Sequence, residues 1–572
     1  MIAWHAFYLP EELVASPRRT SWPDLTTGVR GVNEQIARGR LEGVVRQRIA
    51  PLFLIGLSCF IAIARFHTYS EPLDHDITAT AVIASEMRAG RAYYSDLWEN
   101  KPPARFVAHI IVQSLFGYGR SSLYALNVGL GVLTLFGVYV AASAMGMGPT
   151  ASLWAAVFWA LTSGDLDLQA NQPNTEAFMN APLIWAFALL LRARRAAIVE
   201  DHSYLLRTLA IGGLLALATF YKPQSILYCF FLVVAHVIYP PEGAPSGRRQ
   251  ALKEVSIIAG VGAAAWIAFF FYFAMTGRFK IVYTTMFIYP GYYSGNMFKN
   301  FWASLALSNL FPRQMLFTSA LVFLSVLGGI IAWVKRSTRQ GAMLLAYAVA
   351  TQLTIGITGM FYPHYYQLWL PILAVGAGWS VVLLRHVIKQ DYAPWRRHVF
   401  AVIALASIVP SELWLYRMDP EHWALQAYGE VYVRSERLGH EIDKILEPGE
   451  TLYVLGDEPV FYFVTKRRPP TGVFFLQALA SGPLAQELTA RVVNDLVRNP
   501  PDLVVIMSDA VGPKTVSSDH ATLGPDHPLR MWVSQNYHCP PGKYGHKFFA
   551  ICARPGSPLD QSESYRDLAA RL

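Results

Sequence analysis

The sequence predicts a polytopic α-helical membrane protein with about eleven spans, followed by a C-terminal α/β domain. Hydrophobic residues make up 53% of the 572 residues and charged residues only 15%, which is typical of a chain that lies mostly in lipid. The apolar residues gather in stretches that approach the length of a bilayer crossing, and this pattern ends near residue 417. Beyond that point short apolar runs alternate with polar segments, as in a folded domain outside the membrane.

The first element is a polar, arginine-dotted segment over residues 1–48, which we expect to be cytoplasmic. It shows no cleavable signal peptide, so the span at 49–65 is predicted to act as its own signal anchor. Further apolar stretches that predict spans lie near residues 123–144, 150–163, 177–192, 207–220, 222–239, 254–274, 314–334, 341–358, 366–386 and 398–416.

The distribution of basic residues predicts on which side of the membrane each loop lies. The stretch "RFVAHIIVQSLFGYG" at 105–119 is too short to span and is predicted to be re-entrant or interfacial. The basic connections "RARRAAIVEDHSYLLR", "GRRQALKE", "VKRSTRQ" and "RHVIKQDYAPWRRH" then share the side of the N-terminal segment. The positive-inside rule puts that side in the cytoplasm and the C-terminus outside an inner (plasma) membrane. The same clusters account for the net charge of +9 without a nucleic-acid partner.

On this topology residues 49–416 form the transmembrane domain, and residues 417–572 form a soluble periplasmic or extracellular domain. The outer loops are 66–122, 164–176, 275–313 and 361–366. In the soluble domain, "TLYVLG", "PDLVVIM" and "KFFAICAR" predict short strands, and "EVYVRSERLGHEIDKILEPGE" predicts an amphipathic helix. Cys539 and Cys552 could pair if this domain lies in an oxidising compartment.

Carboxylates gather directly after the first span, in "EPLDHDITATA". Asp76 precedes a pattern that predicts a helix on the outer membrane surface, so it can be the N-cap of that helix, a catalytic base, or both. Glu71 and Asp74 are expected to hydrate or orient the loop, and Asp74 is also a candidate for contacting the acceptor or a metal ion. In the second outer loop, Asp165 and Asp167 are expected to be solvated.

Cations and aromatic residues follow at the outer ends of apolar segments. Lys101 and Lys222 each precede proline, and each can be a lysine that reaches lipid headgroups or a fixed cation for an anionic lipid group. Glu176 opens a span, where it can complement the helix dipole or take part in catalysis. His364 and Tyr365 lie in "FYPHYYQLWLP" and are candidates for contacting the acceptor or a metal ion.

The order of these pieces resembles the GT-C glycosyltransferases that use polyprenyl-phosphate sugars, especially the protein O-mannosyltransferase and aminoarabinose transferase families. The shared pattern is an acid after the first span, then "A…EM..G..YY.D.W..KPP", a later "TE", a Lys-Pro and a "YPHY….LP" segment, over roughly residues 50–385. The resemblance implies that Asp76 and Glu176 are the catalytic acids and that Lys101 and Lys222 bind the donor phosphate. Many O-mannosyltransferases carry a second acid directly after the first, where this chain has isoleucine.

The resemblance further implies a GT-C-like fold and transfer of a sugar from a polyprenyl-phosphate donor to a hydroxyl of a lipid, glycan or protein, with inversion. Arg313 in "LFPRQ" is the next candidate for the phosphate. No cofactor is required, although a divalent ion bridging Asp76, Glu176 or His364 stays open. The alternative is a transporter or flippase for lipid-linked substrates, or a non-catalytic component of envelope assembly. A transporter would concentrate its acids near the bilayer midplane, often in two repeated halves, and neither feature is apparent.

Overall fold

The structure, a computed structural model, describes residues 49–192, 202–241, 247–334, 338–387, 398–508, 522–540 and 548–572. Contacts divide the chain into residues up to Pro51 and a compact unit over 52–572. The second unit contains the helix core, the cavity of the candidate site and the C-terminal sheet.

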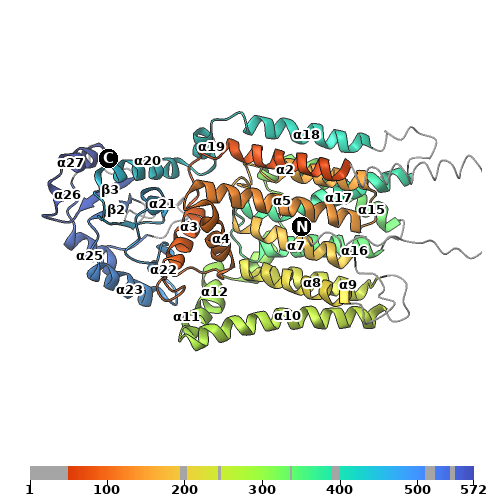
Figure 1. Ribbon diagram of the computed structural model, residues 1–572, viewed down its shortest axis with the longest axis horizontal. Helices are drawn as coiled ribbons and strands as arrows, with labels where there is room; N and C mark the ends of the chain where they lie inside the picture. The colour runs from red at the N-terminus through yellow and green to blue at the C-terminus, as the bar shows by residue number, and fades with distance from the viewer. Residues whose placement is uncertain are drawn as a thin grey trace, which may run out of the picture. The chain divides into compact units, whose positions relative to one another are not determined.

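Apolar stretches form the helices of Figure 1. The longer ones are α2 (Ala50–His67), α5 (Arg120–Ala144), α6 (Pro149–Thr162), α7 (Thr175–Leu191), α8 (His202–Tyr221), α9 (Ile226–Ile238), α10 (Gly247–Met275), α15 (Ser319–Val334), α16 (Thr338–Gly356), α17 (Leu370–Val387) and α18 (Val399–Leu415). Shorter elements connect them: η3 (Pro223–Ser225), α11 (Phe279–Tyr283), η4 (Thr284–Ile288), α12 (Tyr289–Ser294), α13 (Met297–Ser304), α14 (Leu307–Leu310), η5 (Arg313–Thr318), η6 (Pro363–Trp369) and α19 (Pro420–Ala427).

The prediction of eleven spans is too high. Among the described residues, six helices are long and apolar enough to cross a membrane, or seven if the bent pair α18 and α19 counts as one. Two of the expected spans form α6 and α7, which have only 14 and 17 residues. At 1.5 Å per residue these helices cover about 21 and 26 Å, less than the hydrocarbon core of about 30 Å. The polytopic helical class itself is confirmed.

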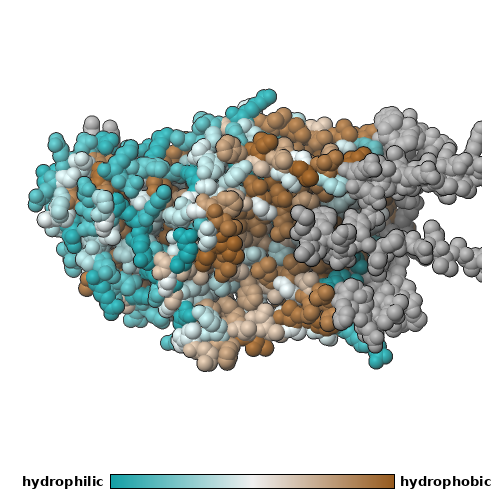
Figure 2. Space-filling model, in the orientation of Figure 1, coloured by the Kyte–Doolittle hydropathy of each residue, from teal (hydrophilic) through white to brown (hydrophobic). Residues whose placement is uncertain are grey.

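The core of the bundle is formed by α5, α6, α7, α15 and α17, which pack side by side (Figure 1). Small residues let these helices approach closely. A methyl group at Gly137 of α5 would lie 2.5 Å from the side chain of Ile184 in α7. One at Gly378 of α17 would lie 2.9 Å from Ala155 of α6. On the face shown in Figure 2, apolar side chains cover the bundle helices and polar ones gather over the C-terminal part.

Two helices from the first outer loop, α3 (His75–Arg88) and α4 (Ala104–Phe116), pack against each other. With 13 residues, α4 is too short to span, as the sequence predicts. Residues 77–84 of α3 are all buried in the protein, and the position of this helix on the outer membrane surface stays a prediction. A buried helix is free to point its first turn into an enclosed site rather than at lipid headgroups.

The C-terminal part contains a three-stranded sheet in the order β1-β2-β3, with β1 (Leu452–Leu455) parallel to β2 (Leu503–Met507) and β3 (Phe549–Ala553) antiparallel to it. The small C-terminal α/β fold predicted from the sequence is thereby confirmed. Its helices are α20 (Glu430–Ile445), α21 (Val460–Thr465), α22 (Gln477–Ala480), α23 (Ala485–Arg498), α25 (Pro528–Asn536), α26 (Pro558–Gln561) and α27 (Glu563–Arg571). A disulfide joins Cys539 and Cys552, the two cysteines that the sequence left as a candidate pair.

The C-terminal part and the first outer loop share one hydrophobic core. The amide of Trp98 donates to the carbonyl of Gly472 at 2.8 Å, and Arg468 forms an ion pair with the buried Glu86 of α3 at 2.9 Å. Apolar burial and paired charges therefore hold the C-terminal part against the loop that carries the candidate catalytic acid.

Candidate active site

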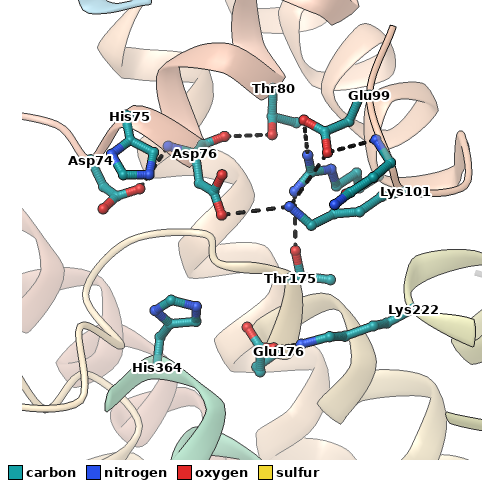
Figure 3. Close-up of polar contacts among 12 residues, drawn as sticks. Asp74, His75, Asp76, Thr80, Glu99, Lys101, Thr175, Glu176, Lys222 and His364 are labelled. Atoms are coloured by element: carbon teal, nitrogen blue, oxygen red, sulfur yellow. Dashed lines mark hydrogen bonds and ion pairs between the residues drawn. The ribbon is translucent and has the colours of Figure 1, made fainter. Parts of the chain in front are cut away.

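A cavity of about 730 Å³ gathers most of the candidate residues. Its walls come from the first outer loop, the segment before α7, the α8–α9 connection, residues around α12, the start of η6 and the C-terminal part. The candidates among its lining residues are Asp74, Asp76, Lys101, Glu176, Lys222, His364 and Tyr365. Residues far apart in the sequence therefore share one space, and Figure 3 shows most of them facing it.

Asp76 lies in the first turn of α3, but it is not the N-cap. The cap is Asp74, whose Oδ1 accepts a hydrogen bond from the amide of Asp76 at 2.7 Å. The carboxylate of Asp76 is left to face Lys101, with 3.6 Å between Oδ2 and Nζ (Figure 3). Burial works to raise the pKa of Asp76, but the positive charge of Lys101 and weaker contributions from neighbours outweigh it and hold that pKa well below the usual range.

The backbone of Lys101 is anchored by hydrogen bonds, and its ammonium group lies between two carboxylates. The hydroxyls of Tyr93 and Tyr94 donate to its carbonyl oxygen at 2.7 and 3.0 Å, which anchors the chain before the two prolines. Its Nζ lies 3.6 Å from Asp76 and 3.6 Å from Oε1 of Glu99. One lysine therefore bridges two carboxylates without a close hydrogen bond to either, an arrangement that an incoming anion can disturb.

Glu99 and Arg105 are polar residues of the site that the sequence reasoning missed. Both are buried, and Nη2 of Arg105 lies 3.4 Å from Oε2 of Glu99. Nη1 of Arg105 donates to Oγ1 of Thr175 at 3.1 Å, so this side chain ties α4 to the first residue of α7. Both residues lie in the stretch "WENKPPARF", and a charge pair so close to the KPP element was the signal available for finding them.

The second acid–lysine pair is short and buried. Nζ of Lys222 donates to Oε1 of Glu176 at 2.8 Å, and the two side chains are 9% and 1% exposed. The same ammonium lies 3.6 Å from the centre of the Tyr365 ring, a favourable cation–π contact. Burial lowers the pKa of Lys222, and the attraction of Glu176 opposes this shift. The Lys-Pro turn between α8 and η3 thus places its cation beside the first turn of α7.

His364 points into the same space from η6, near Glu176 (Figure 3). Its Nδ1 lies 3.1 Å from Oε1 of Gln169, and its ring stacks on Tyr362. Among the described residues, no group of three or more His, Cys, Asp and Glu side chains is arranged to hold a metal ion. Three carboxylates of the cavity, those of Asp76, Glu99 and Glu176, are instead paired with lysines and an arginine.

Arg313 does not join the others. It opens η5, is absent from the residues that line the cavity, and its charge acts on Asp167 of the second outer loop. The structure therefore brings together every candidate of the sequence analysis except this one.

Two acids of the outer loops are buried, which contradicts the solvated position expected for Asp165 and leaves Glu71 the expected role of orienting the loop rather than hydrating it. Glu71 is 1% exposed, and Oε1 accepts hydrogen bonds from Asn171 and Gln172 at 2.6 Å each. Burial raises the pKa of Glu71 to about 8, although these hydrogen bonds oppose the shift. Asp165 is fully buried, and burial followed by the charge of Asp167 raises its pKa to about 8. Both acids tie loops together, because the loops are packed under other elements rather than exposed to water.

Searches for known relatives gave a match in structure alone. No family model matches the chain, and no curated protein matches it. ArnT from Cupriavidus metallidurans is similar with a TM-score of 0.53 and 15% identity, covering 86% of this chain and 97% of ArnT in the apo state. ArnT bound to undecaprenyl phosphate gives the same TM-score and identity, with 88% and 98% covered.

A second kind of solved structure is also similar. It is the archaeal oligosaccharyltransferase AglB from Archaeoglobus fulgidus, solved with an inhibitory peptide and a dolichol-phosphate. The TM-score is 0.50 and the identity 12%, covering 92% of this chain and 78% of AglB. These glycosyltransferases share the GT-C fold, so the GT-C resemblance drawn from the sequence is confirmed at the level of the fold.

Proposed function

We propose that this protein is an integral membrane glycosyltransferase that moves a sugar from a polyprenyl-phosphate donor to a hydroxyl of a lipid, glycan or protein acceptor. The observation that carries the proposal is the meeting of two carboxylate–lysine pairs in one cavity, Asp76 with Lys101 and Glu176 with Lys222. The GT-C fold supports it, and so does the likeness to ArnT bound to undecaprenyl phosphate.

We assign the donor phosphate to the side of the cavity where Lys101 and Lys222 lie. Ammonium groups of Lys101 and Lys222 bind the phosphate of the donor and stabilise the charge that develops on it as the sugar leaves. Ile226 and Phe287 line the same cavity and are each 58% exposed on the outside of the protein. An isoprenoid chain attached to the phosphate can therefore pass over apolar side chains into the lipid.

Asp76 is the proposed base. The acceptor oxygen attacks the anomeric carbon, the bond from that carbon to the phosphate oxygen breaks, and the electron pair leaves with the phosphate. The acceptor proton passes to the carboxylate of Asp76. Because attack and departure occur on opposite faces of the sugar, the anomeric configuration inverts.

The donor itself prepares this base. Without donor, Lys101 faces Asp76 and keeps its pKa low, which makes a weak base. When the phosphate draws the ammonium of Lys101 toward itself, the carboxylate loses part of that stabilisation and its basicity rises. The base therefore becomes stronger only where a donor is bound.

Glu176 serves as the second catalytic acid by holding Lys222 against the leaving phosphate. Asp74, His364 and Tyr365 line the same cavity, and we assign them to contact with the acceptor. The transfer needs no cofactor, since the phosphate is already the leaving group.

The reaction takes place on the outer face of the membrane, in the orientation that the basic connections predict. The disulfide between Cys539 and Cys552 supports this side for the C-terminal part, since such bonds persist in oxidising compartments.

Mass spectrometry of a deletion strain tests the proposal. Loss of the protein should cause one polyprenyl-phosphate sugar to accumulate, and the same sugar should disappear from an envelope lipid, glycan or protein. The wild-type gene should reverse both changes, and a gene with Asp76→Asn should reverse neither. Unchanged lipids and glycans in the deletion strain would contradict the proposed activity. Loss of the sugar from the glycans, with the donor trapped on the cytoplasmic side, would instead favour a flippase.

A further inference from the structure

One wall of the cavity comes from the C-terminal part, whose role the sequence leaves open. Apart from Ala427, its members are aromatic or hydrogen-bonding side chains, namely Tyr428, Tyr432, Asp457, Phe475 and Gln477. They lie after α19, in α20, after β1 and around the start of α22.

This wall is held directly beside the proposed base. The hydroxyl of Tyr432 lies 2.5 Å from Nδ1 of His75, and the two rings stack with centres 5.6 Å apart. His75 immediately precedes Asp76, and Phe475 contacts the His75 ring edge-to-face at 5.9 Å. The tyrosine and phenylalanine rings are only partly buried, so a molecule in the cavity can contact them.

A backbone contact orders the wall. One oxygen of Asp457 accepts a hydrogen bond from the amide of Leu476 at 2.6 Å. This bond joins the end of β1 to the segment that carries Phe475 and Gln477, so the rings and the polar groups keep fixed relative positions.

Charge divides the cavity into two sides. Every lysine and arginine among its lining residues, namely Lys101, Arg105 and Lys222, comes from the first 222 residues of the chain. The wall from the C-terminal part contributes a carboxylate, an amide and tyrosine hydroxyls, with no cation among its lining residues. The first side also holds the carboxylates of Asp74, Asp76, Glu99 and Glu176, so the two sides differ in that only the first offers cations with which an anionic group can pair.

We propose that the C-terminal wall is the acceptor subsite and that it binds a neutral sugar ring. This deepens the proposed function and rests on it. Aromatic faces such as Tyr432 and Phe475 pack against the C–H face of a pyranose, while Asp457 and Gln477 bind its hydroxyls. An acceptor that presents a phosphate at this position is disfavoured by Asp457 and Asp74. The acceptor hydroxyl then lies next to Asp76, across from the donor phosphate.

A glycan array tests this with the full-length chain in nanodiscs, with and without undecaprenyl phosphate. Neutral oligosaccharides should be retained, while their phosphorylated counterparts and serine- or threonine-rich peptides should not. Tyr432→Ala and Phe475→Ala should each weaken retention about tenfold, the scale of a lost aromatic contact. Tyr432→Phe keeps the ring but loses the hydroxyl near His75, so it should bind nearly as well as the wild type.

The matched control is Tyr283→Ala, which removes a tyrosine that is 46% exposed and outside the cavity lining. It should leave glycan retention unchanged. Preference for phosphorylated glycans or peptides, absence of any glycan retention, or equal loss with Tyr432→Phe and Tyr432→Ala would each overturn the subsite. Undecaprenyl phosphate binding is measured separately by native mass spectrometry and should be the same in all variants. If the wild type does not bind undecaprenyl phosphate, the proposed donor is wrong. Glycan retention by the protein in nanodiscs without undecaprenyl phosphate still decides the subsite.

Discussion

The two acid–lysine pairs of the cavity differ in how tightly they are made. Asp76 and Lys101 lie 3.6 Å apart, with side chains 29% and 21% exposed. Glu176 and Lys222 lie 2.8 Å apart and are almost fully buried, with the lysine also over the Tyr365 ring. The Asp76–Lys101 pair, here called the open pair, can exchange partners. The Glu176–Lys222 pair, here called the closed pair, is fixed in the protein.

This difference suggests a division of labour. A base must meet a hydroxyl that arrives from outside, and its lysine partner must be able to turn toward the donor, which the open pair allows. Breaking a buried pair leaves one charge without water or partner, which makes the closed pair part of the fold as well as of the site. Variants in the two pairs should therefore fail in different ways.

Asp76→Asn should give the largest effect. The amide keeps the shape of the side chain but cannot take the acceptor proton, so the single-turnover transfer rate should fall about 10²–10⁴-fold. The thermal midpoint should change little, because Asp74 caps α3. Asp74→Asn is the matched control and should retain most activity, since asparagine is also a good N-cap. A folded Asp76→Asn protein with nearly normal transfer would shift the base to Asp74 or Glu176.

Lys222→Ala should destabilise the fold as well as the reaction. It leaves the carboxylate of Glu176 buried and unpaired, a loss of about 3–5 kcal/mol in the free energy of unfolding. The double variant Glu176→Gln with Lys222→Met should recover much of the thermal midpoint but not transfer. If Lys222→Ala alone unfolds at the wild-type temperature, the closed pair has no structural role.

Lys101→Ala should leave the fold intact and weaken use of the donor. A hydrogen bond to a charged group contributes about 1.5–3 kcal/mol, so the donor KM should rise roughly 10–100-fold. Lys101→Arg should recover part of this loss. Because the variant also removes the cation beside Asp76, the pKa of Asp76 should rise, and the acidic limb of the pH–rate profile should move to higher pH. Unchanged donor use would place the phosphate away from Lys101.

The smallest effect concerns Glu71, which is not in contact with either acid–lysine pair. Its folded pKa of about 8 exceeds the unfolded value of about 4.3, so its contribution to stability is complete below about pH 4 and is lost as pH rises toward 8. Between pH 6 and 7.5 the loss is at most about 2 kcal/mol. Thermal midpoints of the wild type should fall across this range relative to Glu71→Gln. Parallel pH curves for the two proteins would show that Glu71 is ionised when buried.

Much of the site could be predicted because polar residues at the ends of apolar stretches are conspicuous. Asp76, Lys101, Glu176 and Lys222 each stand where an apolar segment begins or ends, and one side of a membrane brings such positions together. Their pairing could not be predicted, since it depends on how α3 turns toward Lys101. The sequence offered Asp76 as a possible N-cap, two residues after the actual cap, because Asp74 and Asp76 are equally good capping residues by type.

Other features of the structure correspond to no local pattern in the sequence. Glu71 and Asp165 have the composition of solvated loops, and only packing from distant segments buries them. The C-terminal wall around Tyr432 and Phe475 depends on a docking surface that no periodicity reveals. The count of spans failed because hydropathy alone does not separate a full crossing from a helix of 14 residues such as α6.

The most direct test of the account is the position of the donor phosphate. A structure of the full-length chain in nanodiscs with undecaprenyl phosphate, solved by electron cryo-microscopy, would show it. The account predicts the phosphate in the cavity within hydrogen-bonding distance, about 3 Å, of both Lys101 and Lys222, with the isoprenoid chain passing Ile226 and Phe287. A phosphate outside the cavity, with the Asp76–Lys101 pair unchanged, would contradict it.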